Sequence, residues 1–412
     1  MNISTDFLLA IPKPDLHVHL DGSLRLGTLI ELAQEYGVSL PSYTEDGLRA
    51  LVFKERYENL GEYLTGFRYT VAVLQSEAAI ERVAYELALD NQAEGVRYIE
   101  VRYAPHLHSH SHLDPIQTMR AVNRGLERAA RSYNERPGVV AGTEPPFAFG
   151  IIVCGLRMFS REYSEYYANL LSAHRFSPPS EVYGWATLEL VRAAVEARDR
   201  HAVPIVGLDL AGQERGYPPI DHEAAYRFAH RHFLCKTVHA GEAYGPESIF
   251  QAITELHADR IGHGYYLMDA GMVSDPQVPN ADAYVHALSQ YIADRRITLE
   301  VCLTSNFQTI PELTELGLHN ARKFRDARLS FAICTDNRLI SNTSVTKELQ
   351  LAVAHLGFDL RDIRNAVIYG FKRSFFPGTY AAKRAYVRQI IDHYGAQEEL
   401  FKTASATTGS EP

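Results

Sequence analysis

The chain has 412 residues, 46% of them hydrophobic and 22% charged, a composition typical of a globular protein rather than a disordered or fibrous one. Its net charge of -9 offers no basic stripe to a phosphate backbone, so we expect no nucleic-acid partner. The first fifteen residues lack the basic start and long apolar run of a signal peptide, and no window is apolar enough to span a bilayer. We therefore expect a soluble, cytoplasmic protein with no membrane partner.

Short β-rich segments alternate with segments of helical periodicity, which is the pattern of repeated βαβ units. Most of the strand-like segments are continuous apolar runs, as parallel strands buried on both faces require. Eight are predicted, ending near residues 20, 103, 156, 212, 242, 267, 306 and 337. The predicted fold class is therefore α/β, a (β/α)8 TIM barrel.

Two regions extend beyond the eight repeats. Residues 24–80, between the first two strands, are longer than one crossover and predict several short helices, a lid-like insertion over the barrel mouth. Further helices follow the eighth strand, and the small, polar tail 403–412 is expected to be disordered. Because no interdomain linker is visible, residues 1–402 are predicted to form a single catalytic domain.

Candidate metal ligands stand on or just after several predicted strands. His17 and His19 are two apart on a strand, so their side chains share a face. His239, His263 and Asp336 lie at the ends of other strands, and in this fold those ends converge on one face. Singly, such a histidine is more often a core residue and such an aspartate a helix N-cap. Together, three histidines and an aspartate suit Zn²⁺.

A zinc site at this face suggests hydrolytic chemistry. Zinc brings the pKa of a bound water near neutrality and so makes a nucleophile. This nucleophile could add to a ring carbon, C6, of an aromatic nitrogen heterocycle. The neighbouring ring nitrogen, N1, must then be protonated. Glu242, three residues after His239, is well placed as that acid if its surroundings keep it protonated. His263 is open to two interpretations, a metal ligand or a group that takes or orients the water proton.

A second histidine-rich segment is also a candidate for metal binding. His106, His108, His110 and His112 alternate in HLHSHSH, a composition typical of a metal-binding tract. The tract has no acidic partner, so we interpret it as a polar loop and not as the main site. The HExxH, Walker and GxSxG motifs and the zinc signature of cytidine-type deaminases are absent from the sequence.

The segments LHVHLDGS, EVRYAPHL, IVCGLR, GLDLAGQE, HAGE, GHG, TSNFQT and CTDN occur in this order. Together they closely resemble the adenosine deaminase family of the amidohydrolase superfamily, from about residue 12 to 380. The resemblance implies a hydrolase of purine metabolism that converts adenosine, and 2'-deoxyadenosine, to inosine and ammonia. It implies one Zn²⁺ per subunit, with a zinc-bound hydroxide attacking C6 while Glu242 protonates N1.

The resemblance also assigns roles to individual residues. The zinc ligands that it implies are His17, His19, His239 and Asp336. Its catalytic residues are Glu242, the proton donor, and His263, beside the zinc-bound hydroxide. The substrate-binding residues expected from it are Asp21 at the ribose hydroxyls, Gly212 at the purine N3 edge, His19 and Asn337.

One position departs from the family pattern. Familiar members have Thr-Asp-Asp at the eighth strand, whereas this chain has Thr335, Asp336 and Asn337. Purine N7 is an acceptor, and an asparagine amide donates hydrogen bonds at any ordinary pH. We therefore predict that Asn337 keeps the N7 contact.

Three alternatives remain open. The substrate could be another aminopurine, such as free adenine or a modified nucleoside, or the barrel could bind nucleosides or zinc without catalysis. A nucleotide substrate is less expected, because Arg25 and Arg102 are interpreted as structural or surface cations and no phosphate clamp is evident. The oligomeric state is not determined by the sequence.

Overall fold

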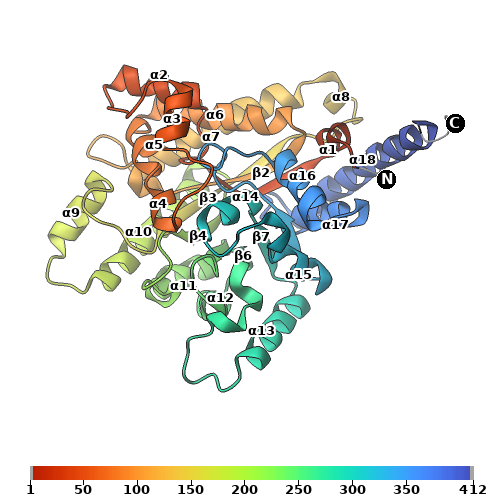
Figure 1. Ribbon diagram of the computed structural model, residues 1–412. Coiled ribbons are helices and arrows are strands. Elements are labelled where there is room, and N and C mark those ends of the chain that lie inside the picture. Colours follow the sequence, from red (N-terminus) through yellow and green to blue (C-terminus); the bar gives the residue numbers. More distant parts are fainter. Residues whose placement is uncertain (1–2, 409–412) are drawn as a thin grey trace.

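A barrel of eight parallel strands forms the centre of the computed structural model, which describes residues 3–408 (Figure 1). Each strand pairs in parallel with the next one along the chain. At the closing seam, His19 N donates to Asp336 O and Asp336 N to His17 O, both at 2.7 Å. The strands are β1 (Lys13–His19), β2 (Val96–Tyr103), β3 (Ala148–Leu156), β4 (Ile205–Ala211), β5 (Cys235–Ala240), β6 (Arg260–His263), β7 (Thr298–Val301) and β8 (Phe331–Ile333). The predicted (β/α)8 fold is confirmed.

The last three strands are shorter than the sequence pattern predicted. Strand β6 stops at His263, because Gly264 adopts φ +63° and Tyr265–Met268 form a 3₁₀ turn. Strand β7 stops at Val301, and helix α14 (Leu303–Thr309) begins two residues later. Side chains after β7 are therefore presented by a helix and do not follow the alternation of a strand.

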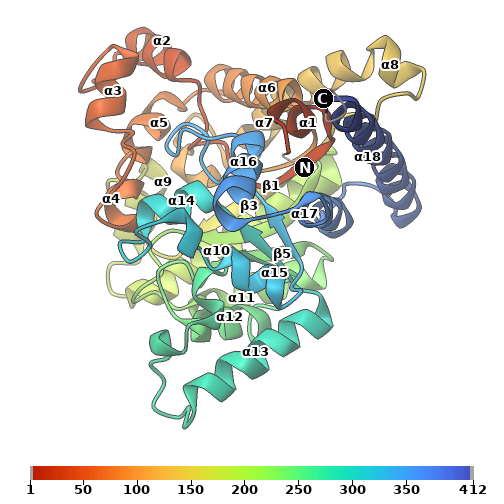
Figure 2. The ribbon, with the colours of Figure 1, turned by 45° about the vertical axis from the view of Figure 1, so that its right-hand side comes forward.

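Helices surround the barrel (Figures 1 and 2). Helix α6 (Glu77–Ala93) begins where Ser76 Oγ accepts from Ala79 N, and it ends just before Gly95. Gly95 has φ +90°, and a Cβ there would meet Leu9 O at 2.3 Å, so glycine is required. The other helices that follow the strands are α7 (Pro115–Asn134), α8 (Pro137–Val140), α9 (Glu165–Ala173), α10 (Pro179–His201), α11 (Glu223–Arg231), α12 (Pro246–Thr254), α13 (Ala281–Arg295), α15 (Ala321–Asp326), α16 (Val345–Leu356) and α17 (Leu360–Arg373).

The stretch 24–80 is helical and gathers on one side of the barrel (Figure 2). Besides the start of α6, it contains α2 (Leu26–Tyr36), α3 (Glu45–Leu51), α4 (Leu60–Leu64) and α5 (Phe67–Val73). Tyr57 N donates to Gln308 O at 3.1 Å, and Arg49 donates to Leu339 O at 2.9 Å. The insertion is thus bonded to segments that follow β7 and β8, at the carboxyl-terminal end of the barrel.

Helix α18 (Tyr380–Thr408) is the last element, and it lies near α1 (Thr5–Ala10) (Figure 1). Phe7 stacks on Phe401 with ring centroids 4.6 Å apart, which ties the late turns of α18 to the amino-terminal helix. The prediction of a disordered tail from residue 403 was wrong for residues 403–408, which continue this helix. Residues 409–412 lie outside the described part of the chain.

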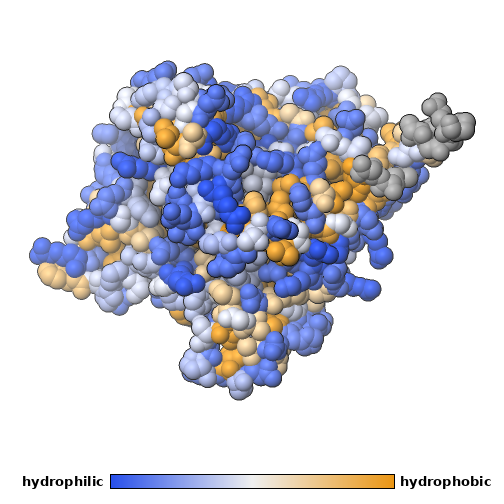
Figure 3. All heavy atoms as spheres, in the orientation of Figure 1, coloured by the Kyte–Doolittle hydropathy of each residue, from blue (hydrophilic) through white to orange (hydrophobic). Residues whose placement is uncertain are grey.

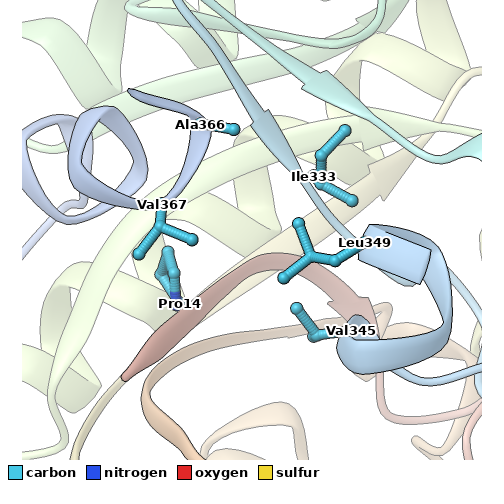
Figure 4. Close-up of a pocket in the computed structure, with 6 residues that line it drawn as sticks. All are labelled: Pro14, Ile333, Val345, Leu349, Ala366 and Val367. Atoms are coloured by element: carbon cyan, nitrogen blue, oxygen red, sulfur yellow. The ribbon is translucent and has the colours of Figure 1, made fainter. Parts of the chain in front are cut away.

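An apolar gap lies between the barrel and helices α16 and α17 (Figure 4). It has no room for a water molecule, so it is a seam of side-chain packing and not a ligand site. It is lined by Pro14, Ile333, Val345, Leu349, Ala366 and Val367. On the face shown in Figure 3, hydrophilic residues predominate between separate hydrophobic patches. Within residues 3–408, no helix is both long and apolar enough to cross a membrane.

Candidate active site

Four side chains converge at the carboxyl-terminal mouth of the barrel. His17 and His19 come from β1, His239 from β5, and Asp336 follows β8, and their ligand atoms lie within 4.8 Å of one another. His19 Nε2 is 3.3 Å from His239 Nε2 and 3.4 Å from Asp336 Oδ1. Ligand atoms at the corners of a tetrahedral zinc site, with bonds of ~2.1 Å, are about 3.4 Å apart. The spacing therefore suits a single small cation.

The protonation states of His19 and Asp336 also suit a metal ion. Burial holds the pKa of His19 well below its usual value, so the imidazole keeps a free lone pair at neutral pH. His17 Nε2 is buried and has no hydrogen-bond partner within the described chain. Although burial opposes it, His17, 3.5 Å away, and the other imidazoles nearby hold the pKa of Asp336 below its usual range. The four side chains together fit a bound metal.

A buried network orients two of these histidines. His17 Nδ1 lies 2.8 Å from Glu300 Oε2, and His239 Nδ1 lies 3.1 Å from Asp209 Oδ2. Each carboxylate keeps a proton on Nδ1 and so leaves the Nε2 lone pair for the cluster. Arg102 joins the two carboxylates, with nitrogens 2.9 Å from Asp209 and 2.8 Å from Glu300.

Sequence reasoning missed Asp209 and Glu300. Each interrupts an otherwise apolar strand, and a charge inside a parallel barrel strand needs a partner, which is the signal that could have found them. The interpretation of Arg102 and Arg25 as structural or surface cations is confirmed. Arg102 is buried in the network, whereas Arg25 pairs with Asp90 at the surface.

Glu242 lies in the turn after β5 and is only 5% exposed. Burial raises its pKa to about 8, and the carboxylates of Asp336 and Glu214 add to that rise. Its Oε1 is 3.6 Å from His263 Nε2. A buried carboxyl group that stays protonated near pH 7 is suited to proton donation.

Glu214 holds the turn that carries Glu242. Its carboxylate accepts hydrogen bonds from four successive backbone N–H groups at 2.7–3.0 Å. These are the N–H groups of Gly241, Glu242, Ala243 and Tyr244. Glu214 belongs to the GLDLAGQE segment, but the sequence alone did not distinguish it as a support for Glu242.

A hydrogen-bond relay specifies which nitrogen of His263 bears the proton. Ala321 N–H donates to His319 Nδ1 at 3.0 Å, so His319 carries its proton on Nε2, which lies 3.2 Å from Asn306 Oδ1. Asn306 Nδ2 then donates to His263 Nδ1 at 3.1 Å. Burial keeps the pKa of His263 well below its usual value, so the ring is neutral and presents Nε2–H to the site. His263 also has φ +60°, which is rare outside glycine.

The residues expected to bind substrate also follow strands at this mouth. Asp21 comes two residues after β1, Gly212 directly after β4 with φ +96°, and Asn337 four residues after β8. Asn337 Nδ2 donates to Tyr63 Oη at 2.9 Å. Its Oδ1 lies against Gly22, where a Cβ would come within 1.8 Å.

The histidine tract is packed more tightly than a polar loop. His106 stacks on Tyr166 with centroids 3.8 Å apart, and His108 Nδ1 is 3.0 Å from Leu74 O. Both side chains are buried, which corrects the loop interpretation for this part of the tract. Among residues 3–408, the two groups of side chains able to hold a metal ion lie in the barrel mouth, and neither includes the tract.

The fold and the cluster define an amidohydrolase-type barrel with a candidate metal site at its mouth. The family model "Adenosine deaminase" matches residues 12–177 and 183–393. Adenosine deaminase 1 of Streptomyces coelicolor is 34% identical, over 99% of this chain and 93% of that protein. Adenosine deaminase of Mycobacteroides abscessus is also 34% identical, over 89% of this chain and 91% of that protein. The chain belongs to the adenosine deaminase family, and it is a hydrolase of that family.

Solved structures share the fold at lower identity. An amidohydrolase from Burkhoderia ambifaria with bound zinc has a TM-score of 0.77 at 20% identity, and the match covers 98% of this chain and 96% of that chain. Adenine deaminase from Arthrobacter aurescens has a TM-score of 0.70 at 22% identity, and the match covers 93% and 99% of the two chains. These likenesses show a common architecture and do not identify the substrate.

Proposed function

We propose that this protein catalyses the zinc-dependent hydrolytic deamination of adenosine, and of 2'-deoxyadenosine, to the corresponding inosine nucleoside and ammonia. The observation that carries the proposal is Glu242, a buried carboxyl group with a pKa of about 8 beside a cluster that fits a metal ion. The names of the relatives in Streptomyces coelicolor and Mycobacteroides abscessus support the same reaction.

His17, His19, His239 and Asp336 would hold one zinc ion, because their atoms have the spacing and the lone pairs that zinc prefers. When bound, zinc supplies a strong nucleophile from water at neutral pH. The carboxylates of Glu300 and Asp209 keep two of the imidazoles oriented toward that ion.

Glu242 acts as the proton donor of the reaction. In its protonated form it donates to purine N1 as water adds to C6, which removes the negative charge that would otherwise develop on the ring. Glu214 keeps the Glu242 turn in place through its four backbone contacts. His263 directs Nε2–H into the site, so it orients the attacking water by donating a hydrogen bond.

Residues on three strand ends hold the nucleoside. Asn337 donates to purine N7, the backbone at Gly212 approaches the N3 edge, and His19 and Asp21 contact the sugar. The insertion 24–80 acts as a lid over this site, since Tyr57 and Arg49 bond it to segments after β7 and β8.

Loss of ultraviolet absorbance during deamination tests the proposal. Zinc-loaded enzyme is assayed with adenosine, adenine, AMP and N6-methyl-AMP, beside a Glu242→Gln variant that keeps the size of the side chain. We expect adenosine to be the best substrate and the variant to lose roughly 100- to 10,000-fold in kcat. Turnover of only another aminopurine would keep the chemistry and replace the substrate, whereas an active Glu242→Gln variant would remove Glu242 from its role.

A further inference from the structure

His108 and Asp21 form a buried pair beside the metal-fitting cluster. His108 follows the short 3₁₀ helix η1 (Pro105–Leu107) after β2 and is 1% exposed, and Asp21 is 3% exposed. His108 Nε2 lies 3.8 Å from Asp21 Oδ2, while Asp21 Oδ1 lies 4.0 Å from His19 Nδ1. Asp21 therefore lies between His108 and His19, a residue of the cluster.

The structure determines the hydrogen-bonding state of His108. Its Nδ1 is 3.0 Å from the carbonyl oxygen of Leu74, which can only accept a hydrogen bond. Nδ1 therefore carries a proton, and in that tautomer Nε2 is an acceptor directed toward Asp21.

Two acceptors in this pair lack a donor. Neither His108 Nε2 nor Asp21 Oδ1 has a hydrogen-bond partner in the part of the chain that the structure describes. Asp21 Oδ2 receives one long contact, 3.4 Å from Ala104 N. At 3.8 Å, His108 and Asp21 are too far apart to satisfy each other, and buried acceptors without donors are costly.

We infer that His108 joins Asp21 in binding hydroxyl groups of the ligand's sugar. Hydroxyls supply the donors that both acceptors need, and a free purine base carries no hydroxyl group. The inference rests on the proposed function and adds His108 to the residues that select a nucleoside over free adenine. His108 is thus a specificity-determining residue within the histidine tract.

The test compares His108→Asn with the wild type on four substrates. Asparagine places an amide N–H where His108 Nδ1–H was, so it keeps the bond to Leu74 O and removes only the Nε2 acceptor. The substrates are adenosine and its 2'-deoxy, 3'-deoxy and 5'-deoxy forms. His112→Asn, at an exposed histidine of the same tract, is the matched control.

We expect His108→Asn to lower kcat/KM for adenosine by roughly 10- to 100-fold and to have little effect on the one deoxy analogue that lacks the bound hydroxyl. His112→Asn should match the wild type on all four substrates. An equal loss on all four substrates, as from a structural ion pair with Asp21, would overturn the inference, and so would no loss on any of them.

A binding measurement separates this inference from the proposed reaction. Calorimetry with inosine and its deoxy forms requires no turnover and reports the same hydroxyl dependence. Hydroxyl-dependent binding that is lost in His108→Asn, in a protein that does not deaminate adenosine, would uphold the inference and reject the proposed function. Adenosine turnover with no hydroxyl-specific effect of His108→Asn would uphold the proposed function and reject the inference about His108.

Discussion

Tyr63 of helix α4 accepts a hydrogen bond from Asn337 Nδ2 at 2.9 Å and lies 2.8 Å from Ser341 Oγ. A residue of the insertion thus supports Asn337, the side chain expected to contact purine N7, at the barrel mouth. All three side chains are buried, so the contact is shielded from water. The insertion and the candidate N7-binding group are therefore one hydrogen-bonded unit.

This contact predicts the behaviour of two variants. Asn337→Ala should lower kcat/KM for adenosine by roughly 10- to 100-fold, because N7 loses its donor. Tyr63→Phe should cause a smaller loss, since the Asn337 amide is then free to turn. Both losses should shrink on 7-deazaadenosine, which has no N7 acceptor. Tyr36→Phe, at an exposed tyrosine of the same insertion, is the control.

Wild-type turnover of adenosine by Asn337→Ala would reject the N7 contact. Equal losses of kcat/KM on adenosine and 7-deazaadenosine would mean that Asn337 and Tyr63 support the fold of the barrel mouth and do not contribute a hydrogen bond to N7.

The carboxylate behind His17 should control metal affinity. Glu300→Gln keeps the shape of the side chain but weakens its hold on the proton of His17 Nδ1, so we expect zinc to bind roughly 10- to 100-fold less tightly. Competition with a chelator of known affinity measures this directly. Glu58→Gln, at an exposed carboxylate, is the control. Unchanged zinc affinity in Glu300→Gln would show that Glu300 serves only to pair Arg102 and Arg260.

The relay through Asn306 should determine the tautomer of His263. ¹⁵N NMR of the metal-free protein at neutral pH should show the His263 proton on Nε2. Asn306→Asp replaces a donor by an acceptor and should move that proton to Nδ1, with a fall in kcat once zinc is restored. The NMR experiment reports the tautomer whether or not the variant is active. A proton on Nδ1 in the wild type would contradict the proposed orienting role.

Glu348 should make stability depend on pH. It is fully buried on α16, where burial raises its pKa to about 7, and it accepts hydrogen bonds from Thr304 and Thr343. The unfolded chain ionises this group near its ordinary pKa of about 4.3, so the folded state binds the extra proton between that pH and 7. The contribution is therefore full below about pH 4 and is lost as pH rises toward 7.

Glu348→Gln should remove this dependence. The free energy of unfolding of the wild type should fall relative to the variant by up to roughly 3 kcal/mol between pH 4 and 7. Urea unfolding across that range measures the difference. Parallel pH profiles for the two proteins would show that Glu348 is ionised throughout in the folded state.

The family, the barrel and the set of polar residues at strand ends could be predicted from the sequence. Alternating β and helical patterns specify a parallel barrel, and a barrel brings its carboxyl strand ends to one face whatever lies between them. His17, His19, His239 and Asp336 were therefore expected to meet, and Glu242 was expected near His239 because it follows in the same turn.

The partners of those residues were decided only by the tertiary structure. Glu300 behind His17, Asp209 behind His239 and Tyr63 beside Asn337 are all far apart in sequence from the groups that they hold. A charged or polar side chain finds its partner through burial, because desolvation is costly until a hydrogen bond offsets it. Pairings of this kind leave no periodic pattern in the sequence. For the same reason, the sequence predicted a polar loop at His108, although the fold buries this residue beside Asp21.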